Sequence, residues 1–270
     1  MMNSVPTQEE QPDAYREFAE FYDLYVGGWL GDLPFYLEYA RSMKGPVLEI
    51  GAGSGRLTLP LVRAGVELVA VDASPSMLAI LKRRLAEEAD DVRERVRVVE
   101  ADARRLAVGE TFKLVMVPFY TFNYFLTSED QRAALRRVAE HTSEAGIVLI
   151  DVFLPLSRIE HCSTEPVLKV DTVDTQTGNH VRGWNRYEVD TESQIETRRH
   201  VFEVTEPDGR VTRKEFTTRR RYFFPYELEA VFADNGFEVE LIFSGYDGKP
   251  PTAESEELLY VLRRRNGADE

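Results

Sequence analysis

Short apolar runs alternate with amphipathic stretches along the first 155 residues. The apolar runs predict strands, at 46–50, 67–71, 96–99, 112–117 and 147–153. Between several of them, apolar residues recur at the helical period and predict helices, at 57–64, 76–88 and 128–141. Ser128 followed by Gln131 predicts a capping box at the start of the last of these helices. Buried strands that alternate with amphipathic helices are typical of a parallel sheet covered on both faces.

Aromatic residues mark the region before the first predicted strand. Five of them recur there at helical spacing: Tyr15, Phe18, Phe21, Tyr22 and Tyr25. The spacing predicts one or two helices between residues 13 and 43. Gly27 and Gly28 interrupt the pattern, and we expect the helix to restart near Leu33.

The pattern changes after residue 155. Between residues 166 and 224 polar and apolar residues alternate with a period of two, which is typical of half-exposed strands. Gly178-Asn179 and Asp208-Gly209 are dipeptides that favour hairpin turns. This segment therefore predicts an antiparallel insert of three to five strands.

The chain then returns to its earlier pattern. Pro225 is expected in the first turn of a helix that runs to Asn235 and is closed by Gly236. Two more apolar runs predict final strands, at 237–243 and 257–263. The fold class is therefore α/β: a mostly parallel sheet of seven strands with helices on both faces, and an antiparallel β insert between the fifth strand and the last helix. We expect four parts: an N-terminal helical lid at 1–45, a core at 46–155, the insert at 156–224, and the end of the core sheet at 225–270.

Composition narrows the classes of function. The 270 residues carry 33 Lys and Arg against 47 Asp and Glu, a formal net charge of −14, which argues against a protein that grips nucleic acid. Cys162 is the single cysteine, so we expect no intrachain disulfide and no cysteine-cluster metal site. No paired spacing of histidines or carboxylates indicates any other metal site, so we expect no metal. No apolar run approaches the roughly 18 residues of a membrane helix, and the acidic N-terminus differs from a signal peptide. We expect a cytoplasmic protein, either monomer or homodimer, that binds neither nucleic acid nor membrane.

A glycine-rich loop, Gly51-Ala52-Gly53-Ser54-Gly55-Arg56, follows the first predicted strand and opens a helix. This layout is typical of a nucleotide-cofactor site, although such a turn also occurs in purely structural roles. Arg56 stands where the dinucleotide fingerprint has its third glycine, and the Gly-Lys-Ser/Thr ending of ATPase phosphate loops is missing. Glu49, two residues before the loop, would repel a pyrophosphate but suits a ligand with an ammonium or sulfonium charge.

Two more carboxylates follow the next two strands. Asp72 ends the second strand, where a carboxylate can accept from both hydroxyls of a ribose. The alternative for Asp72 is a charge at the N-terminus of the following helix. Asp102 follows the third strand, where it could accept from the exocyclic amine of an adenine, or be an ordinary loop acid. The correlated spacing of the loop and both acids favours ligand binding.

Together, Glu49, the three glycines, Asp72 and Asp102 resemble the class I S-adenosylmethionine-dependent methyltransferases, which have a Rossmann-like sheet. The resemblance covers residues 46–153 closely and 237–263 more loosely. It implies S-adenosylmethionine as cofactor, with its methionine part over Gly51 and Gly53, its ribose on Asp72 and its adenine on Asp102. The implied cofactor site comprises Tyr22, Glu49, Gly51, Ala52, Gly53, Gly55, Asp72, Ala73, Met77, Asp102, Ala103 and Pro118.

Three of the implied contacts have structural alternatives. In related small-molecule enzymes an aromatic N-terminal helix closes over the cofactor, and Tyr22-Asp23-Leu24-Tyr25 is similar to that motif. Tyr15 would line the same lid, but helix packing explains Tyr15 and Tyr22 equally well. Met77 either packs on the adenine face or fills the core.

The segment after the fourth strand bears on the substrate. In this superfamily it lies nearest the reactive methyl group, and enzymes that modify amines of DNA or of protein glutamine carry Asn/Asp-Pro-Pro-Tyr there. Val117-Pro118-Phe119-Tyr120 lacks the leading polar residue, which argues against those substrates. The chain is more similar to small-molecule methyltransferases with a β-rich insert, including amino-sugar N,N-dimethyltransferases and the glycine N-methyltransferase group. The insert would then cover the pocket and select the substrate.

The implied reaction is direct in-line transfer of a methyl group to nitrogen or oxygen of a small-molecule acceptor. An amine needs only to be neutral, whereas a hydroxyl or carbon acceptor needs a base. The candidate catalytic residues are Tyr120, Tyr124 and His161, with Asn123 as an orienting partner. The remaining histidines have simpler expected roles: His141 meets the terminal carbonyls of its helix, and His180 and His200 lie at the surface or in hairpins.

Three other functions stay open on the sequence alone. One is an NAD(P)-dependent oxidoreductase, and another is a module that binds S-adenosylmethionine without catalysis. The third is methylation of nucleic acid along a basic strip formed by Arg198-Arg199 and Arg219-Arg220-Arg221. Because the insert has balanced charges, we expect instead a solvated sheet with salt bridges.

Overall fold

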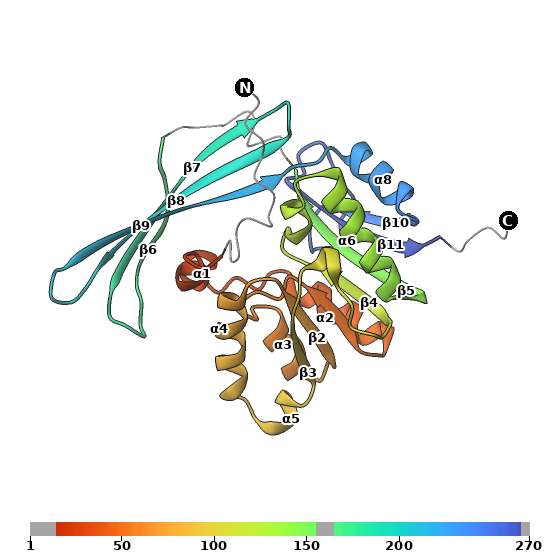
Figure 1. The fold of residues 1–270 in the computed structure, drawn as a ribbon, viewed down its shortest axis with the longest axis horizontal. Coiled ribbons are helices and arrows are strands. Elements are labelled where there is room, and N and C mark those ends of the chain that lie inside the picture. Colours follow the sequence, from red (N-terminus) through yellow and green to blue (C-terminus); the bar gives the residue numbers. More distant parts are fainter. Residues whose placement is uncertain (1–14, 155–164, 266–270) are drawn as a thin grey trace.

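The core of the protein is a seven-stranded sheet with the strand order β10-β11-β5-β4-β1-β2-β3 (Figure 1). The structure is a computed structural model and describes residues 15–154 and 165–265. Strand β11 pairs antiparallel with both of its neighbours, and the other pairs are parallel. The predicted fold class is confirmed. The strands are β1 (Val47–Ile50), β2 (Leu68–Asp72), β3 (Val96–Glu100), β4 (Phe112–Val117), β5 (Thr142–Phe153), β10 (Phe237–Phe243) and β11 (Glu257–Arg264).

Helices cover both faces of this sheet, as the apolar strands require. Within β5, Val148 and Ile150 pack toward α6 and α8, whereas Ile147 and Leu149 pack toward α2, α3 and α4. No described helix is long and apolar enough to cross a membrane. The helices are α1 (Ala19–Val26), α2 (Leu33–Met43), α3 (Thr58–Arg63), α4 (Pro75–Ala86), α5 (Asp90–Arg93), α6 (Ser128–His141) and α8 (Pro225–Asp234), with the 3₁₀ turns η2 (Ala103–Arg105) and η3 (Thr121–Tyr124).

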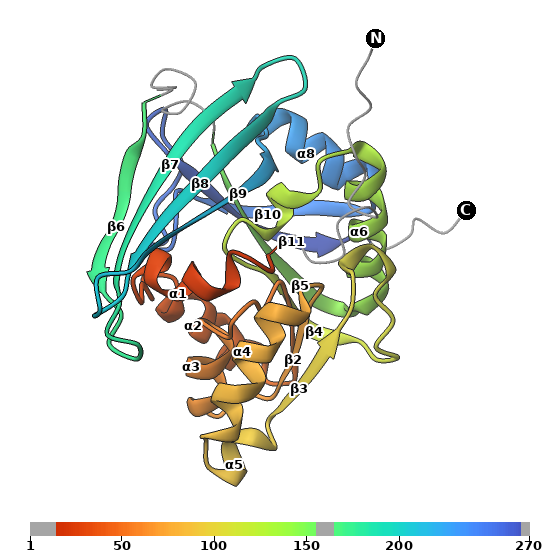
Figure 2. The same ribbon diagram turned by 60° about the vertical axis from the view of Figure 1, so that its left-hand side comes forward.

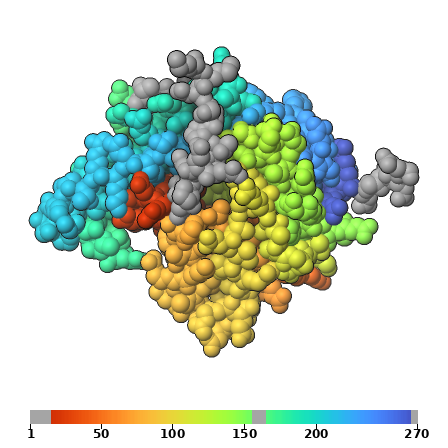
Figure 3. Space-filling model, in the orientation of Figure 1, coloured from red at the N-terminus to blue at the C-terminus, as the bar shows by residue number. Residues whose placement is uncertain are grey.

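The insert is a separate antiparallel sheet of four strands in the order β6-β7-β8-β9. Gly178 and Gly209 have positive φ values of 76° and 87° in its two predicted turns. Figure 2 shows this sheet arching over α1, and Figure 3 shows α1 (red) between the insert and the core. Phe202 and Val204 of the insert pack with Phe18 and Phe21, so α1 joins the two sheets. The insert strands are β6 (Val167–Val173), β7 (His180–Asp190), β8 (Ile195–Thr205) and β9 (Val211–Arg221).

The break between α1 and α2 lies where the glycines predict it. Gly27 has φ 64° and its N–H donates to the Asp23 carbonyl over 2.9 Å, which ends α1 in a left-handed residue. The chain then turns, and α2 begins at Leu33.

The start of α6 differs by one residue from the prediction. Thr127 is the N-cap, and its hydroxyl accepts from the Asp130 N–H over 3.1 Å. Thr127 is extended, with ψ 157°, whereas Ser128 is already helical. Gln131 donates to the Phe125 carbonyl over 3.0 Å, so the predicted Ser128–Gln131 capping box was wrong. At the other end His141 donates from Nδ1 to the Arg137 carbonyl over 2.7 Å, as expected.

One face of the insert is buried and carries polar residues. His200 is 1% exposed, and burial lowers its pKa to about 3, so the expected surface role is wrong. Arg198 and Arg220 are also buried and both donate to Glu196, so neither contributes to an exposed basic strip. The cause is the alternation of β8 and β9, which turns every second residue toward α1 and the core. His180 is more exposed and contacts Asp171 across β6 and β7.

Replacing Thr127 with Ala should lower the free energy of unfolding by about 1 kcal/mol, because the Asp130 N–H loses its acceptor. Ser128→Ala is the matched control and should change it by less than about 0.5 kcal/mol. Urea unfolding of the three proteins measures both values. If Ser128→Ala lowers the free energy of unfolding and Thr127→Ala does not, Ser128 is the N-cap and the assignment to Thr127 is contradicted.

Candidate active site

The glycine loop is fastened between two neighbouring loops. The N–H of Gly51, the first residue of the loop, donates to the Val71 carbonyl of β2 over 2.8 Å. A Cβ on Gly51 would lie 2.3 Å from Thr121 Oγ1, and one on Gly55 would lie 2.4 Å from a methyl carbon of Leu81. Both distances are far shorter than van der Waals contact. Two of the three glycines are therefore required by close packing against η3 and α4.

Asp72 holds two walls of the site together. One carboxylate oxygen accepts from the Gly53 N–H over 2.7 Å, and the other accepts from the Ser74 N–H over 2.8 Å. Ser74 in turn caps α4 by accepting from the Met77 N–H. Asp72 thus fixes the glycine loop and the start of α4 relative to each other.

A cavity of about 570 Å³ opens between these walls. Tyr15 and Tyr22 line it from the N-terminal segment, and Thr121 and Tyr124 line it from η3. Four of the predicted cofactor residues do not line it: Glu49, Ala52, Gly55 and Pro118. Eight do: Tyr22, Gly51, Gly53, Asp72, Ala73, Met77, Asp102 and Ala103.

Glu49 is buried and is not part of the cavity wall. It is 1% exposed and accepts from the Thr58 hydroxyl over 2.6 Å. Burial raises the pKa of Glu49 to about 7, although the Thr58 hydrogen bond opposes this shift. Glu49 therefore changes charge near neutral pH.

Asp102 lines the cavity but already has a strong partner. Its carboxylate accepts from the Arg104 N–H and from Arg104 Nε, each over 2.9 Å. Burial works to raise the pKa of Asp102, but the bonds from Arg104 outweigh it, and the pKa is lowered. Arg104 also binds Asp130 of α6 over 2.6 Å, which fixes η2 to that helix.

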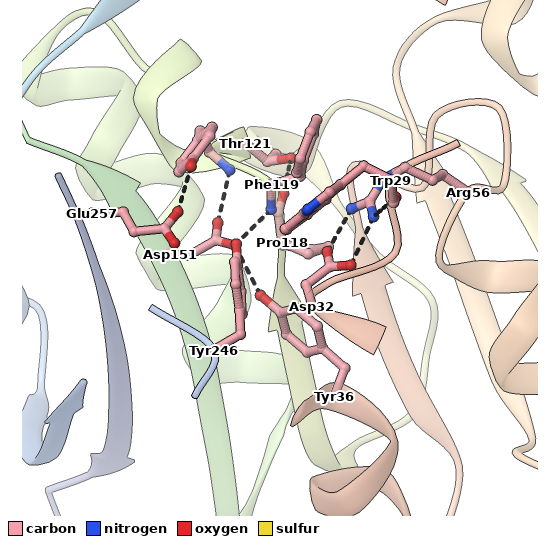
Figure 4. A network of polar contacts seen from close by, with 11 residues as sticks. Trp29, Asp32, Tyr36, Arg56, Pro118, Phe119, Thr121, Asp151, Tyr246 and Glu257 are labelled. Atoms are coloured by element: carbon pink, nitrogen blue, oxygen red, sulfur yellow. Dashed lines mark hydrogen bonds and ion pairs between the residues drawn. The ribbon is translucent and has the colours of Figure 1, made fainter. Parts of the chain in front are cut away.

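Two ion pairs fasten the N-terminal helices to the glycine loop. Asp23 of α1 accepts from the Ser54 hydroxyl over 2.9 Å and from Arg84 of α4 over 2.6 Å. Asp32, which is fully buried, forms a two-point ion pair with Arg56 over 2.6 and 2.7 Å (Figure 4). These contacts hold Tyr22 over the cavity, because Tyr22 precedes Asp23 on α1.

The carboxylate of Asp151, on β5, holds the segment after β4 in its conformation (Figure 4). It accepts from the N–H groups of Phe119 and Tyr120 over 2.9 and 2.7 Å, and from the hydroxyls of Tyr36 and Tyr246. Phe119 and Tyr120 have φ values of 55° and 63°, in the left-handed region that non-glycine residues rarely adopt. Burial raises the pKa of Asp151 to about 6 against the effect of its hydrogen bonds. Asp151 therefore compensates for backbone strain beside the cavity.

Comparison with known proteins agrees with this geometry. A family model described as a methyltransferase domain matches residues 47–146. Cypemycin N-terminal methyltransferase from Streptomyces sp is 28% identical over 260 residues, which cover 94% of this chain and 99% of that protein. This chain carries a class I S-adenosylmethionine-dependent methyltransferase domain.

Solved methyltransferase structures share its fold. The CcbJ methyltransferase from Streptomyces caelestis has a TM-score of 0.77 at 22% identity, and the match covers 95% of this chain and 100% of that one. The sugar N-methyltransferase KedS8 from Streptoalloteichus sp has a TM-score of 0.70 at 19% identity, with 91% and 93% covered. The oxidoreductase and non-catalytic alternatives find no support in these comparisons.

The residues of the methyltransferase cavity fit S-adenosylmethionine. Gly53 lines the cavity, and a Cβ there would lie 3.2 Å from Met77 Cε, so a side chain would crowd this wall. Asp72 presents a carboxylate in the cavity wall, and Met77 offers an apolar surface. The enzyme uses S-adenosylmethionine as its cofactor.

The candidate catalytic residues have different positions in the methyltransferase. Tyr124 lines the cavity, with its ring centroid 5.6 Å from that of Tyr15. Tyr120 does not line it, and its hydroxyl donates to Glu257 of β11 (Figure 4). Asn123 is fully buried and donates to the Arg221 carbonyl over 2.7 Å, which joins η3 to the insert. His161 lies outside the described residues.

Several residues of the site were not predicted from the sequence. Asp151 had a signal, since a carboxylate inside the apolar strand β5 must have buried partners. No sequence signal pointed to Thr121 or to the Asp32–Arg56 pair, because their contacts join segments far apart in the chain.

Replacing Glu49 with Gln should remove a pH dependence of stability. The pKa of Glu49 rises from the ordinary 4.5 to about 7 on folding, so its stabilising contribution is full below about pH 4.5 and is lost as the pH rises through 7. From pH 5 to pH 8 the melting temperature of the wild type should fall relative to Glu49→Gln by roughly 3 °C. Thermal unfolding without cofactor measures this difference, and a difference that stays constant with pH would contradict the burial of an ionisable Glu49.

Proposed function

We propose that this methyltransferase transfers a methyl group to an amine nitrogen of a small-molecule acceptor. The main support is the chemistry of the cavity wall, which includes three tyrosines: Tyr15, Tyr22 and Tyr124. Burial raises the pKa of both Tyr15 and Tyr22 above the ordinary value of 10. Both hydroxyls therefore stay protonated at neutral pH and are poor bases.

Two of the three carboxylates that line the cavity are also poor candidates for a base. Asp72 accepts from two backbone N–H groups, and Asp102 is paired with Arg104 and has a lowered pKa. Apart from the exposed Glu100 at the end of β3, the described cavity wall thus favours an acceptor that needs no base. A neutral amine meets that condition, and a hydroxyl does not.

The name of the Streptomyces relative supports the same choice. Cypemycin N-terminal methyltransferase, 28% identical over nearly its whole length, is named for an amine acceptor. The aligned region covers the insert as well as the core, so the two proteins are similar also in the part that we expect to select the substrate.

Each part of the cavity has a proposed role in positioning. When bound, S-adenosylmethionine supplies a methyl group that its sulfonium charge has already activated. Asp72 would hold the ribose, Asp102 and Met77 the adenine, and Gly51 and Gly53 would let the backbone approach the methionine part. Positioning the amine and excluding water then provide most of the acceleration.

We further infer that the parts of the chain have different roles in binding the cofactor and the acceptor. Residues 1–45 would act as a lid over the cofactor, fastened through Asp23 and Asp32. Residues 46–155 and 225–270 would form the cofactor-binding core. Residues 156–224 would cover the acceptor, because the buried face of the insert lies over α1 and η3 (Figure 2).

The test compares matched acceptors. We expect mass spectrometry to detect a gain of one or more methyl groups on primary amines, such as benzylamine, and none on the matched alcohols, such as benzyl alcohol. Below the pKa of the free amine, kcat/KM should fall about ten-fold per pH unit, because only the neutral amine reacts.

Tyr124→Phe should reduce the rate by less than about ten-fold, with Tyr120→Phe as the control outside the cavity. Methylation of the alcohols alone, or a loss of over about a thousand-fold in Tyr124→Phe, would contradict an amine acceptor.

A further inference from the structure

The apolar side chains of α1 pack with the insert and not with the core sheet (Figure 2). Phe21 and the N-cap residue Phe18 belong to a cluster whose other buried members are all on insert strands: Val170, Val181, Phe202 and Val204. The two clusters that cover the core sheet include no residue of α1 among their described members. Helix α2, by contrast, packs on the core sheet through Phe35 and Tyr36. By its packing, α1 is therefore part of the insert.

One glycine of the insert makes room for the closest of these contacts. The rings of Phe21 and Phe202 are stacked, with centroids 4.3 Å apart and an angle of 12° between their planes. Gly183 lies directly opposite Phe202 in the ladder of β7 and β8, and a Cβ on Gly183 would lie 2.6 Å from a ring carbon of Phe202. A side chain at position 183 would therefore displace the ring on which Phe21 packs.

Hydrogen bonds join the same face of α1 to two strands of the insert. The Tyr25 hydroxyl accepts from Asn185 of β7 over 2.7 Å and from Arg198 of β8 over 3.0 Å. Tyr25 follows Phe21 by four residues, so both side chains lie on one face of the helix. That face is fixed to the insert by stacked rings and by buried polar groups.

The opposite face of α1 meets the core through a partly exposed carboxylate. Asp23 accepts from the Ser54 hydroxyl over 2.9 Å and pairs with Arg84 of α4 over 2.6 Å. The side chains of the ion pair are 40% and 32% exposed, and exposed ion pairs contribute little to stability. Tyr22, beside Asp23, lines the cofactor cavity. Moving α1 away from the core would break these polar contacts, whereas moving it away from the insert would expose aromatic rings to water.

The chain can turn at both ends of this assembly. Gly27 and Gly28, which follow α1, have φ values of 64° and 69°, and a Cβ on either would have no described atom within 4 Å. The insert is bonded to the core where β9 ends, since the Arg221 carbonyl accepts from Asn123 and the Arg221 guanidinium pairs with Glu227 of α8 over 2.8 Å. Helix α1 packs near the other end of β8, so it lies at a distance from this attachment.

We propose that α1 and the insert strands β6–β9 form one lid unit, which turns away from the core as a whole to admit and release S-adenosylmethionine. Insert residues that do not touch the cofactor would then help to retain it. The proposal goes beyond the proposed function, because it concerns the cofactor and holds for any acceptor. It also divides the N-terminal region at Gly27, since α2 stays with the core.

The first experiment measures distances in the full chain by double electron–electron resonance, with two spin labels at a time in a Cys162→Ser background. The labelled sites are exposed: Glu17→Cys beside α1, Thr217→Cys on β9 and Lys82→Cys on α4 of the core. Without cofactor, the distributions from Lys82 to Glu17 and to Thr217 should both contain a longer component that saturating S-adenosylmethionine removes. The distribution between Glu17 and Thr217 should stay the same. A change between Glu17 and Thr217, or none between Thr217 and Lys82, overturns the proposal.

The second experiment tests whether the insert retains the cofactor. Gly183→Ala and Asn185→Ala change residues that face α1 and do not line the cavity. Radiolabelled S-adenosylmethionine, chased with excess unlabelled cofactor, should dissociate at least about five-fold faster from each variant than from the wild type. Thr217→Ala, at an exposed position of the same sheet, is the control and should leave the rate unchanged. Circular dichroism establishes that each variant is folded, and a wild-type dissociation rate in the folded variants contradicts a shared lid unit.

Discussion

The site depends on one carboxylate that binds the backbone on both sides of a cavity. Asp72 accepts from the N–H of Gly53 with one oxygen and from that of Ser74 with the other. These bonds add to the packing of Met77 and Leu81, both on α4, against the same loop. The same carboxylate lines the cavity, so one residue both joins these two segments and forms part of the cavity wall.

The other loops of the methyltransferase domain are held in the same manner. Asp151 binds the strained backbone of Phe119 and Tyr120, and Asp32 binds Arg56 of the glycine loop (Figure 4). Asp23 holds α1 against the same loop by accepting from the Ser54 hydroxyl. Each carboxylate is bonded to groups from a different segment of the chain. A cavity built from loops is thereby preorganised, which matters when catalysis relies on positioning.

The sequence was informative where local pattern decides structure. Apolar periodicity predicted the strands and helices of both sheets, and the spacing of Asp72 and Asp102 from the glycine loop placed both acids on one cavity. It was less informative where distant segments meet. The buried position of His200 depends on which face of the insert meets α1, and the contact of Thr121 with Gly51 depends on the packing of two loops. Periodicity gives the alternation of a strand but not which face is covered.

Isothermal titration of S-adenosylmethionine into the wild type and Asp72→Asn tests the role of Asp72 most directly. An amide nitrogen cannot accept from Gly53 or Ser74, nor from a hydroxyl, so we expect the affinity to fall at least about ten-fold. Asp91→Asn, at an exposed carboxylate of α5, is the control and should bind as the wild type does. Thermal unfolding without ligand establishes that each variant is folded. Equal affinity in folded Asp72→Asn and the wild type would contradict a cofactor site organised by Asp72.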